Sequence, residues 1–265
     1  MFGEYIARWQ LIADGAPIVT HSSQLLPVIY RGEKAMLKVA VEAEEQFGGG
    51  LMEYWSGDGA ARVYRHEKPA LLMERAQGVR SLHRMAKTGF DDEATRILCE
   101  TAARLHAGRD KAQPELIPLR MWFVELEESA AKYGKTIQKA ALVAQELLSE
   151  QREVTTLHGD LHHDNVLDFG PRGWLAIDPK RLLGERTFDF ANIFCNPDFE
   201  VAASAGRLAR QARVVAEVAH VDHRRLLQWI LAYAGLSAVW IMNSGEEERL
   251  DIDLAVAELA AQALG

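Results

Sequence analysis

The spacing of apolar residues changes near residue 80 and divides the chain into two regions. Before that point the apolar residues form short runs, rich in β-branched and aromatic side chains, which Gly15, Gly32 and Gly59 separate. Runs of this kind predict β-strands. The expected strands are residues 6–12, 18–20, 25–30, 35–40, 60–64 and 70–76.

From Ser81 onward the spacing is helical. Apolar residues between Ala94 and Leu105 recur at i, i+3 and i+4 behind three acidic residues, which predicts a core helix. Further helices are expected at 121–131, at 136–148 and throughout 207–265. The nearly uncharged stretch 226–242 falls short of the roughly 20 apolar residues that span a membrane, so it predicts a buried helix.

Three polar residues stand where short apolar runs end in the middle of the chain. Asp160 and Asn165 belong to the segment His-Gly-Asp-Leu-His-His-Asp-Asn, and Asp178 follows the run Trp-Leu-Ala-Ile. Gly170-Pro171-Arg172-Gly173 predicts a turn between two β-prone runs, and hence a hairpin that sets Asn165 beside Asp178. The pattern predicts that all three side chains project into one cleft.

These residue types suit phosphoryl transfer. Mg²⁺ prefers a few hard oxygen ligands and keeps several waters, a role that Asp178 and Asn165 can fill. The reaction also needs a carboxylate that orients the attacking hydroxyl and accepts its proton, and Asp160 stands five residues before Asn165. Two alternatives are weaker. The spacing of the three histidines does not match a metallo-hydrolase, and a plain polar turn explains neither Asn165 nor Asp178.

The segment 158–165 resembles the His-x-Asp-x-x-x-x-Asn loop of kinases, in the His-Gly-Asp form typical of aminoglycoside phosphotransferases. With the stretch 173–192, the similarity is greatest to the streptomycin 6-phosphotransferase branch, which also contains hydroxyurea-type kinases. The resemblance extends from Trp9 to the C-terminal helices. It implies an α+β, protein-kinase-like fold with a small β-rich N-lobe, residues 1–76, and a larger, mostly helical C-lobe, residues 77–265.

The resemblance also implies an activity. ATP would donate its γ-phosphoryl group with Mg²⁺ bound, GTP not being excluded, and a hydroxyl of an aminoglycoside would accept it, streptomycin being the expected acceptor. Asp160 would be the catalytic residue, and Asn165 and Asp178 would bind the metal. A kinase for another small hydroxyl compound, or a nucleotide-binding protein without turnover, remains an alternative.

Nucleotide contacts follow from the same resemblance. Lys38, the one lysine among apolar neighbours in the run 35–40, is similar to the lysine that holds the α- and β-phosphates. Glu45 is its expected carboxylate partner, with Glu44 next. Gly48-Gly49-Gly50 would cost about 1 kcal/mol each in a helix interior, so the helix here is expected to be short or broken.

Two further segments are expected near the nucleotide. Ser22 and Ser23 stand where kinases place a glycine-rich turn, and their hydroxyls and amides could contact phosphate, a plain polar hairpin being the alternative. The backbone from Glu74 to Ala76 is similar to the hinge that binds adenine.

Supporting positions are expected around the loop. By the resemblance, His158 is a buried, hydrogen-bonded residue beneath the metal-binding segment. Asp189 would accept hydrogen bonds from amides of the catalytic loop, because an unpaired buried carboxylate is costly. Helix N-capping is the alternative for Asp189. Leu105-His106 resembles the pair that closes a long helix in aminoglycoside phosphotransferases.

The charge of the chain limits the classes of molecule that it is expected to bind. A net charge of −8 and a pI of about 5.6 argue against nucleic acid and favour a cationic small molecule. The acidic run 246–253, above all Glu246, Glu247 and Glu248, could bind such a cation or form a solvated face. Cys99 and Cys195 lie far apart in apolar contexts, and no signal peptide or membrane span is recognised. A cytoplasmic monomer or weak dimer is expected.

Overall fold

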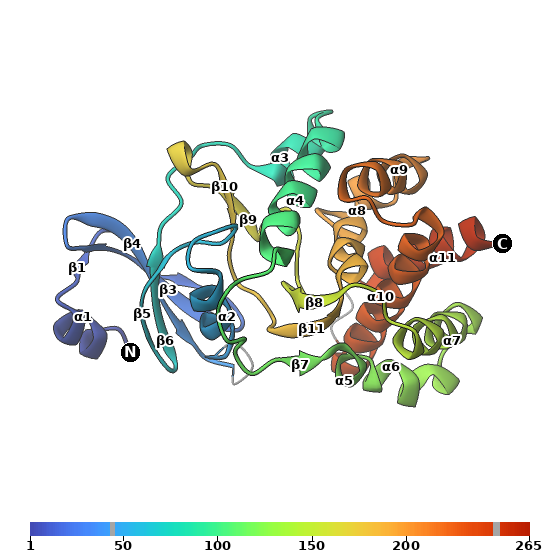
Figure 1. The fold of residues 1–265 in the computed structure, drawn as a ribbon, viewed down its shortest axis with the longest axis horizontal. Helices are drawn as coiled ribbons and strands as arrows, with labels where there is room; N and C mark the ends of the chain where they lie inside the picture. Colours follow the sequence, from blue (N-terminus) through green and yellow to red (C-terminus); the bar gives the residue numbers. More distant parts are fainter. Residues whose placement is uncertain (43–45, 246–249) are drawn as a thin grey trace.

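The computed structural model describes residues 1–42, 46–245 and 250–265. A β-sheet lobe lies at the N-terminal end and a helical lobe at the C-terminal end, with two small β-structures between them (Figure 1). The α+β, two-lobed fold expected from the sequence is therefore confirmed.

The N-lobe is an antiparallel sheet that, within the described residues, has six strands in the order β1-β3-β4-β6-β5, with β2 paired to β3. The strands are β1 Ile12–Ala13, β2 Ile18–Val19, β3 Ser23–Tyr30, β4 Glu33–Ala40, β5 Val63–Glu67 and β6 Ala70–Glu74. Successive side chains of a strand point to opposite faces. In β4, Leu37 and Val39 therefore join one hydrophobic cluster, while Met36 packs on the other face against the larger cluster that continues into the C-lobe. Lys38 lies on that second face.

The expected strand 6–12 is wrong, because the chain forms helix α1, Gly3–Trp9, before the short strand β1. Phe2, Tyr5, Ile6 and Trp9 all pack on the outer cluster of the sheet, and their spacing is the i, i+3, i+4, i+7 of a helix. The run was apolar enough for a strand, but its period was helical. The last predicted N-lobe strands also shift, since β5 begins at Val63 rather than at Ala60.

Helix α2, Gly48–Trp55, begins at the three glycines that were expected to break it. A Cβ on Gly48 would lie 2.6 Å from the backbone oxygen of Pro179, and one on Gly49 would lie 2.6 Å from Nε2 of His66. The glycines thus allow the helix to approach the Asp178-Pro179 segment and β5 closely. The cost in helix propensity is offset by this contact.

The C-lobe combines helices with short strands. Its elements are α3 Leu82–Lys87, α4 Asp91–His106, β7 Ile117–Pro118, α5 Leu119–Trp122, α6 Val124–Ser129, η2 Ala130–Lys132, α7 Lys135–Ser149, β8 Val154–Leu157, β9 Val166–Asp168, η3 Gly170–Arg172, β10 Trp174–Ala176, β11 Leu182–Glu185, η4 Arg186–Cys195, α8 Phe199–Ala202, α9 Arg207–Ala219, α10 His223–Ser244 and α11 Leu250–Leu264. The predicted helices at α4 and α7 and the β9–β10 hairpin are confirmed. The predicted helix 121–131 is instead divided among α5, α6 and η2.

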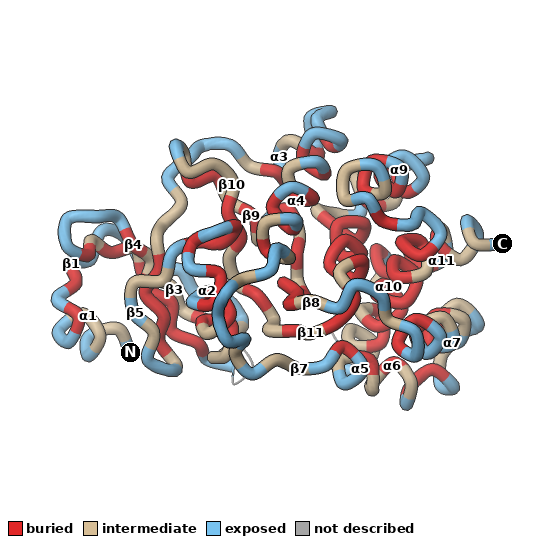
Figure 2. The backbone as a smooth tube through the Cα atoms, in the orientation of Figure 1, coloured by how far each residue is buried: buried red, intermediate tan, exposed pale blue. Residues whose placement is uncertain are grey.

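Helix α10 is the central helix of the C-lobe. It is long and apolar enough to cross a membrane by length and composition, but 67% of its most apolar stretch is buried inside the protein (Figure 2). Trp229 is completely buried and contacts the rings of Phe123 and Phe188. At the N-terminal end Arg225 pairs with the buried carboxylate of Glu185, with contacts of 2.6 and 2.7 Å. The expectation of a buried helix is confirmed.

The three glycines of α2 provide a matched pair of substitutions. Gly48→Ala should lower the free energy of unfolding by about 1–3 kcal/mol, because the new methyl group overlaps the Pro179 carbonyl. Gly50→Ala should raise it by about 0.5–1 kcal/mol, because its nearest neighbour, Cβ of Pro114, is 4.0 Å away and alanine favours the helix. Urea unfolding of both variants measures the difference, and equal effects would show that close approach does not select glycine at position 48.

Candidate active site

The loop 158–165 joins β8 to β9, and a buried histidine holds its first turn. Nδ1 of His158 accepts a hydrogen bond from the amide of Asp160 at 3.2 Å, so Nε2 carries the proton and donates to the carbonyl of Ile177 at 2.8 Å. The ring also stacks on Trp55. Burial holds the pKa of His158 below its usual value, so the imidazole stays neutral. His158 therefore ties the loop to the residue before Asp178, the buried and hydrogen-bonded position expected from the sequence.

A single carboxylate holds the backbone of the same loop. Asp189, in η4, accepts hydrogen bonds from the amides of His158 at 2.8 Å and Gly159 at 2.7 Å. Nε2 of His106, at the end of α4, lies 2.7 Å from the same carboxylate. The expected bonds from loop amides are present. The N-capping alternative for Asp189 is wrong, because these donors come from other elements.

Two amides fix the carboxylate of Asp160. Nδ2 of Asn165 donates to Oδ2 at 3.1 Å, and Nδ2 of Asn192 donates to Oδ1 at 2.8 Å. Burial raises the pKa of Asp160 to about 6, an effect that the charge of Lys180 opposes. The carboxylate is thus oriented and is ionised at neutral pH, yet it is more basic than an ordinary aspartate. These are the properties of a general base.

Asn192 was missed at the sequence level. Its own amide is oriented by Asn196, whose Nδ2 lies 2.8 Å from Oδ1 of Asn192. A signal was present, because Asp189 and Asn192 are three residues apart and side chains at i and i+3 align on a 3₁₀-helix. On this face Asp189 accepts hydrogen bonds from the loop backbone, and Asn192 donates one to the carboxylate of Asp160.

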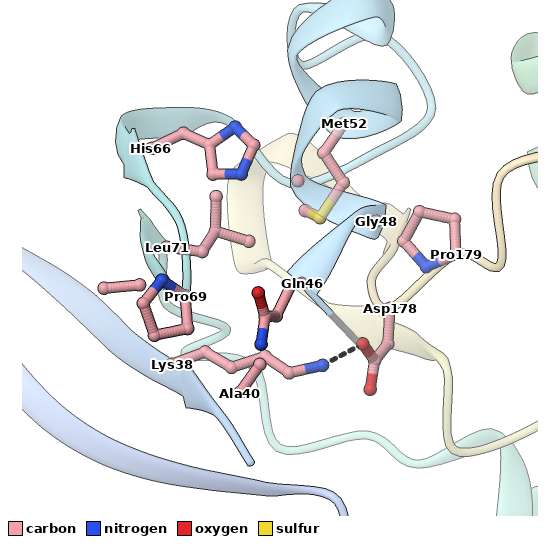
Figure 3. A pocket seen from close by; sticks show the side chains of 12 residues that line it. Lys38, Ala40, Gln46, Gly48, Met52, His66, Pro69, Leu71, Asp178 and Pro179 are labelled. Atoms are coloured by element: carbon pink, nitrogen blue, oxygen red, sulfur yellow. Dashed lines mark hydrogen bonds and ion pairs between the residues drawn. The ribbon is translucent and has the colours of Figure 1, made fainter. Parts of the chain in front are cut away.

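Asp178 faces Lys38 across the cleft between the lobes (Figure 3). Nζ of Lys38 contacts Oδ1 of Asp178, and the Lys38 side chain is buried. Asp178 has a left-handed φ of 65°, which is uncommon for a residue other than glycine and is typical of constrained functional positions. The expected partner of Lys38, Glu45, lies outside the described residues, as does Glu44. The contact with Asp178 was not foreseen.

The oxygen atoms of Asp178 and Asn165 are suitable ligands for a magnesium ion. The amide of Ile177 donates to the carbonyl of Asn165 at 2.9 Å, so the hairpin sets Asn165 beside the residue that precedes Asp178. Nδ2 of Asn165 is committed to Asp160, which leaves its Oδ1 for a cation. One carboxylate and one amide oxygen, with phosphate and water completing the shell, suit Mg²⁺. Among residues 1–42, 46–245 and 250–265, no cluster of three or more His, Cys, Asp or Glu residues could hold a metal by itself.

The turn at 20–23 is a tight hairpin. The amide of Ser23 donates to Oγ1 of Thr20 at 3.0 Å, and the carbonyl of Ser23 accepts from the amide of Thr20. The Ser23 amide is therefore committed to the turn, and the expectation that it contacts phosphate is corrected. The carbonyl of Ser22 accepts from the amide of Val41 at 2.8 Å. Phosphate contact by Ser22, or by the Ser23 hydroxyl, stays a prediction.

The side chain of Glu74 also has a structural partner. Its carboxylate pairs with Arg172 in the turn of the β9–β10 hairpin, and Arg172 donates to the carbonyl of Gly57 as well. Glu74 thus links the N-lobe sheet to the hairpin that carries the candidate metal site. Adenine binding by the backbone from Glu74 to Ala76 stays a prediction.

A cavity of about 240 Å³ opens beside Asp160 on the C-lobe side. Its lining residues come from the catalytic loop, η4, α10 and α11: Asp160, His162, Asn192, Cys195, Asn196, Tyr233, Ser237, Trp240, Ile241 and Asp253. Glu246, Glu247 and Glu248, the residues expected to bind a cation, lie outside the described residues. Because Asp160, the candidate general base, lies in its wall, this cavity is the candidate acceptor pocket.

Comparison with known proteins identifies the family. Residues 8–245 match the model of aminoglycoside/hydroxyurea antibiotic resistance kinases. The chain belongs to this family. It is 51% identical to a streptomycin 3''-kinase of Klebsiella pneumoniae over 97% of this chain and 99% of the relative. It is 29% identical to a streptomycin 6-kinase of Streptomyces griseus over 97% and 87% of the two chains.

Solved structures agree on the fold of this kinase. Aminoglycoside phosphotransferase APH(4)-Ia, solved as a ternary complex with ADP and hygromycin B, superposes with a TM-score of 0.71 at 14% identity, over 98% of this chain and 97% of that one. A choline/ethanolamine kinase family protein of Mesorhizobium loti gives 0.70 at 13% identity, over 97% and 93%. The fold is thus shared with these structures, and the family resemblance read from the loop 158–165 is confirmed by the family model and the 51% identical relative.

The bonds to Asp189 predict a loss of both stability and turnover. Asp189→Ala should lower the free energy of unfolding by about 1–3 kcal/mol, because buried amides lose their acceptor, and should also slow phosphoryl transfer. Asp222→Ala is the control, since Asp222 accepts one amide at the start of α10 and its loss should cost about 1 kcal/mol without slowing transfer. Denaturant unfolding and initial rates separate the two. Equal turnover in both variants would contradict a role for Asp189 in the loop.

The pKa of Asp160 predicts the pH profile of the kinase. A base with a pKa of about 6 must be ionised, so kcat/KM should fall as the pH drops below about 6. Asn192→Ala removes a hydrogen bond that favours the ionised form, so this apparent pKa should rise by roughly one unit. Asn196→Ala should shift it less in the same direction. A reduced rate with an unmoved profile would mean that Asn192 has only a structural role.

Proposed function

We propose that this kinase transfers the γ-phosphoryl group of ATP to the 3''-hydroxyl of streptomycin and thereby inactivates the antibiotic. The observation that carries the proposal is the oriented carboxylate of Asp160, with its raised pKa, in the wall of the acceptor pocket. The choice of hydroxyl rests on sequence identity, which is 51% to the 3''-kinase but 28–30% to the 6-kinases and the hydroxyurea phosphotransferase. The 6-hydroxyl, expected from the loop motif, thus becomes the second candidate.

In the proposed mechanism Asp160 orients the acceptor hydroxyl and takes its proton. Asn165 and Asn192 each hold one carboxylate oxygen, so little reorientation is needed when the hydroxyl binds. His158 and Asp189 keep the loop backbone in place. General base catalysis of this kind contributes roughly 10²–10⁴-fold to the rate.

Asp178 and Asn165 would hold Mg²⁺, which supplies charge neutralisation on the phosphates. Lys38, which contacts Asp178, would bind phosphate oxygens of the nucleotide. Donor and acceptor would then meet at Asp160, with the nucleotide on the side of the N-lobe and the aminoglycoside on the side of α10 and α11. This order is supported by the place of Lys38 on strand β4 of the N-lobe and by the cavity of about 240 Å³ beside Asp160.

We also infer a cytoplasmic location, where ATP is available and cysteines stay reduced. Neither Cys99 nor Cys195 forms a disulfide, and both are buried. Burial raises the pKa of Cys99 to about 12, so this thiol is not a nucleophile. The net charge of −8 fits a cationic substrate better than nucleic acid. A monomer or weak dimer stays the expected state.

The test is a product analysis. Purified protein, ATP and Mg²⁺ are incubated with streptomycin, the added phosphoryl group is detected by mass, and phosphorus–proton correlation NMR assigns the hydroxyl. Phosphate at the 3''-hydroxyl is expected. Asp160→Asn should bind nucleotide normally and transfer roughly 10²–10⁴-fold more slowly.

Other outcomes would redirect the proposal. Phosphate at the 6-hydroxyl would move the kinase to the 6-kinase specificity, and transfer only to hydroxyurea or another small hydroxyl compound would replace streptomycin as substrate. Nucleotide binding with Mg²⁺ but no transfer to any acceptor would favour a binding protein. Normal turnover of Asp160→Asn would remove Asp160 from the base role.

A further inference from the structure

The segment that joins the two lobes is attached to the β9–β10 hairpin at both of its ends. This linker, residues 75–81, leaves strand β6, leads to helix α3 and runs beside the hairpin (Figure 1). At its start Glu74 forms an ion pair with Arg172, in the turn of the hairpin. Near its end the amide of Gly78 donates to the carbonyl of Asp168, on β9, at 2.8 Å. The linker therefore cannot move away from the hairpin without breaking one of these contacts.

A bidentate ion pair adds to these attachments. Asp168 is 5% exposed, and its two oxygens accept hydrogen bonds from Nε of Arg80 at 2.8 Å and from Nη2 at 3.1 Å. The amide of Gly170, in the hairpin turn, donates to Oδ1 at 3.0 Å. The guanidinium of Arg80 also lies over Trp174 on β10, 4.9 Å from the ring centroid. Because such pairs fix orientation as well as distance, Arg80 and Asp168 form a clasp between the linker and both strands of the hairpin.

Glycine at position 78 leaves room for this clasp. A Cβ there would lie 2.0 Å from Cγ of Asp168 and 2.3 Å from its Oδ2, so a larger residue would displace the carboxylate from Arg80. A Cβ on Gly108, by contrast, would have no neighbouring atom within 4 Å. Close approach of the linker to the hairpin therefore requires glycine at position 78.

The same hairpin carries the candidate metal ligands. Asn165 immediately precedes β9, and Asp178 follows the end of β10 by two residues. The backbone from Glu74 to Ala76, which is expected to bind adenine, lies where β6 passes into the linker. One hydrogen-bonded support thus holds the expected binding positions for the two ends of the nucleotide.

We propose that Arg80 and Asp168 are positioning residues that set the separation between the adenine-binding backbone and the metal ligands, so that one ATP molecule reaches both. This inference rests on the proposed function. A ligand that bridges two sites binds more tightly than its separate halves only if the sites are held at the right separation. The clasp therefore affects the binding of whole ATP more than the binding of either half.

The experiment compares ATP with its two halves. Dissociation constants for ATP, adenosine and inorganic tripolyphosphate, each with Mg²⁺, are measured by calorimetry for wild type and Asp168→Asn. The asparagine keeps the shape of the side chain but loses the charge that pairs with Arg80. It should weaken ATP binding roughly tenfold, as expected for a lost hydrogen bond to a charged group, and should change the other two constants less than about twofold.

Further variants test the two sides of the clasp. Arg80→Gln removes a side chain that is 57% exposed, so little packing is lost, and it should weaken ATP as much as Asp168→Asn does. The double variant should weaken ATP no further, because the two residues act as one pair. Gly78→Ala should weaken ATP by displacing Asp168, whereas Gly108→Ala should bind ATP as wild type does.

Glu185→Gln separates the clasp from a general loss of stability. Glu185 forms a comparable buried bidentate pair with Arg225 at the start of α10, with contacts of 2.6 and 2.7 Å. Its loss should lower the melting temperature and leave the dissociation constants for ATP and for both halves unchanged.

Several results would overturn the proposal. They are unchanged ATP binding in Asp168→Asn, an equal weakening of ATP and of either half, and the same loss of ATP binding in Glu185→Gln. If Asp168→Asn does not fold, the comparison is made with Arg80→Gln, for which the same results count against the clasp. Failure of the proposed function is distinct, because it appears in wild type as a lack of ATP binding or of transfer to any acceptor.

Discussion

The active site depends on one buried carboxylate that joins three elements. Asp189 holds the amides of His158 and Gly159 and contacts His106, so η4, the catalytic loop and the end of α4 meet at two oxygen atoms. Each bond is charge-assisted and lies in a low-dielectric interior, where such bonds are strong and their loss is costly. The loop cannot move without breaking at least one of them.

The rest of the loop follows from that anchor. Gly159 has a φ of +80°, and a Cβ at this position would lie 2.8 Å from Leu182, so glycine is required where the backbone turns toward Asp189. This turn presents Asp160 to the side-chain amides of Asn165 and Asn192. Orientation of the candidate base is thus a consequence of hydrogen bonds in the loop and from η4, and partial burial raises its pKa to about 6.

The two lobes meet through the β9–β10 hairpin. The amide of Ala61 donates to the carbonyl of Ala176 across the division that the sequence suggested at residue 76, and just beyond that division the amide of Gly78 donates to the carbonyl of Asp168. Helix α2 also packs into the larger hydrophobic cluster of the C-lobe. The segment that carries Asp178 is therefore held by backbone bonds, whereas Lys38 reaches it through a side-chain ion pair that a bound cation could replace. The candidate metal ligand Asp178 can therefore stay in place while a bound cation replaces its ion pair with Lys38.

The sequence predicted the features that depend on short-range spacing. The interval from Asp160 to Asn165, the turn before Asp178 and the strand around Lys38 each follow from local rules, and the structure places them together. It did not predict features set by tertiary packing. By helix propensity alone the glycines of α2 predict a broken helix, because the close contact of Gly48 with Pro179 joins residues that are far apart in the sequence. The composition of residues 6–12 predicts a strand, whereas the spacing of the apolar residues from Phe2 to Trp9 is helical and the structure forms helix α1.

The same distinction between sequence and packing applies to the recognition of a cationic substrate. A charge of −8 creates a field that attracts cations, but salt screens exposed charges beyond about 8–10 Å, so this field raises encounter rates more than it fixes orientation. Asp253 belongs to that acidic run by sequence, yet it is buried and bonded to Ser237, sixteen residues away on another helix. A buried charge acts at short range and in one direction. Contacts of this kind, such as the bond from Ser237 to Asp253, become visible only when α10 and α11 are packed together.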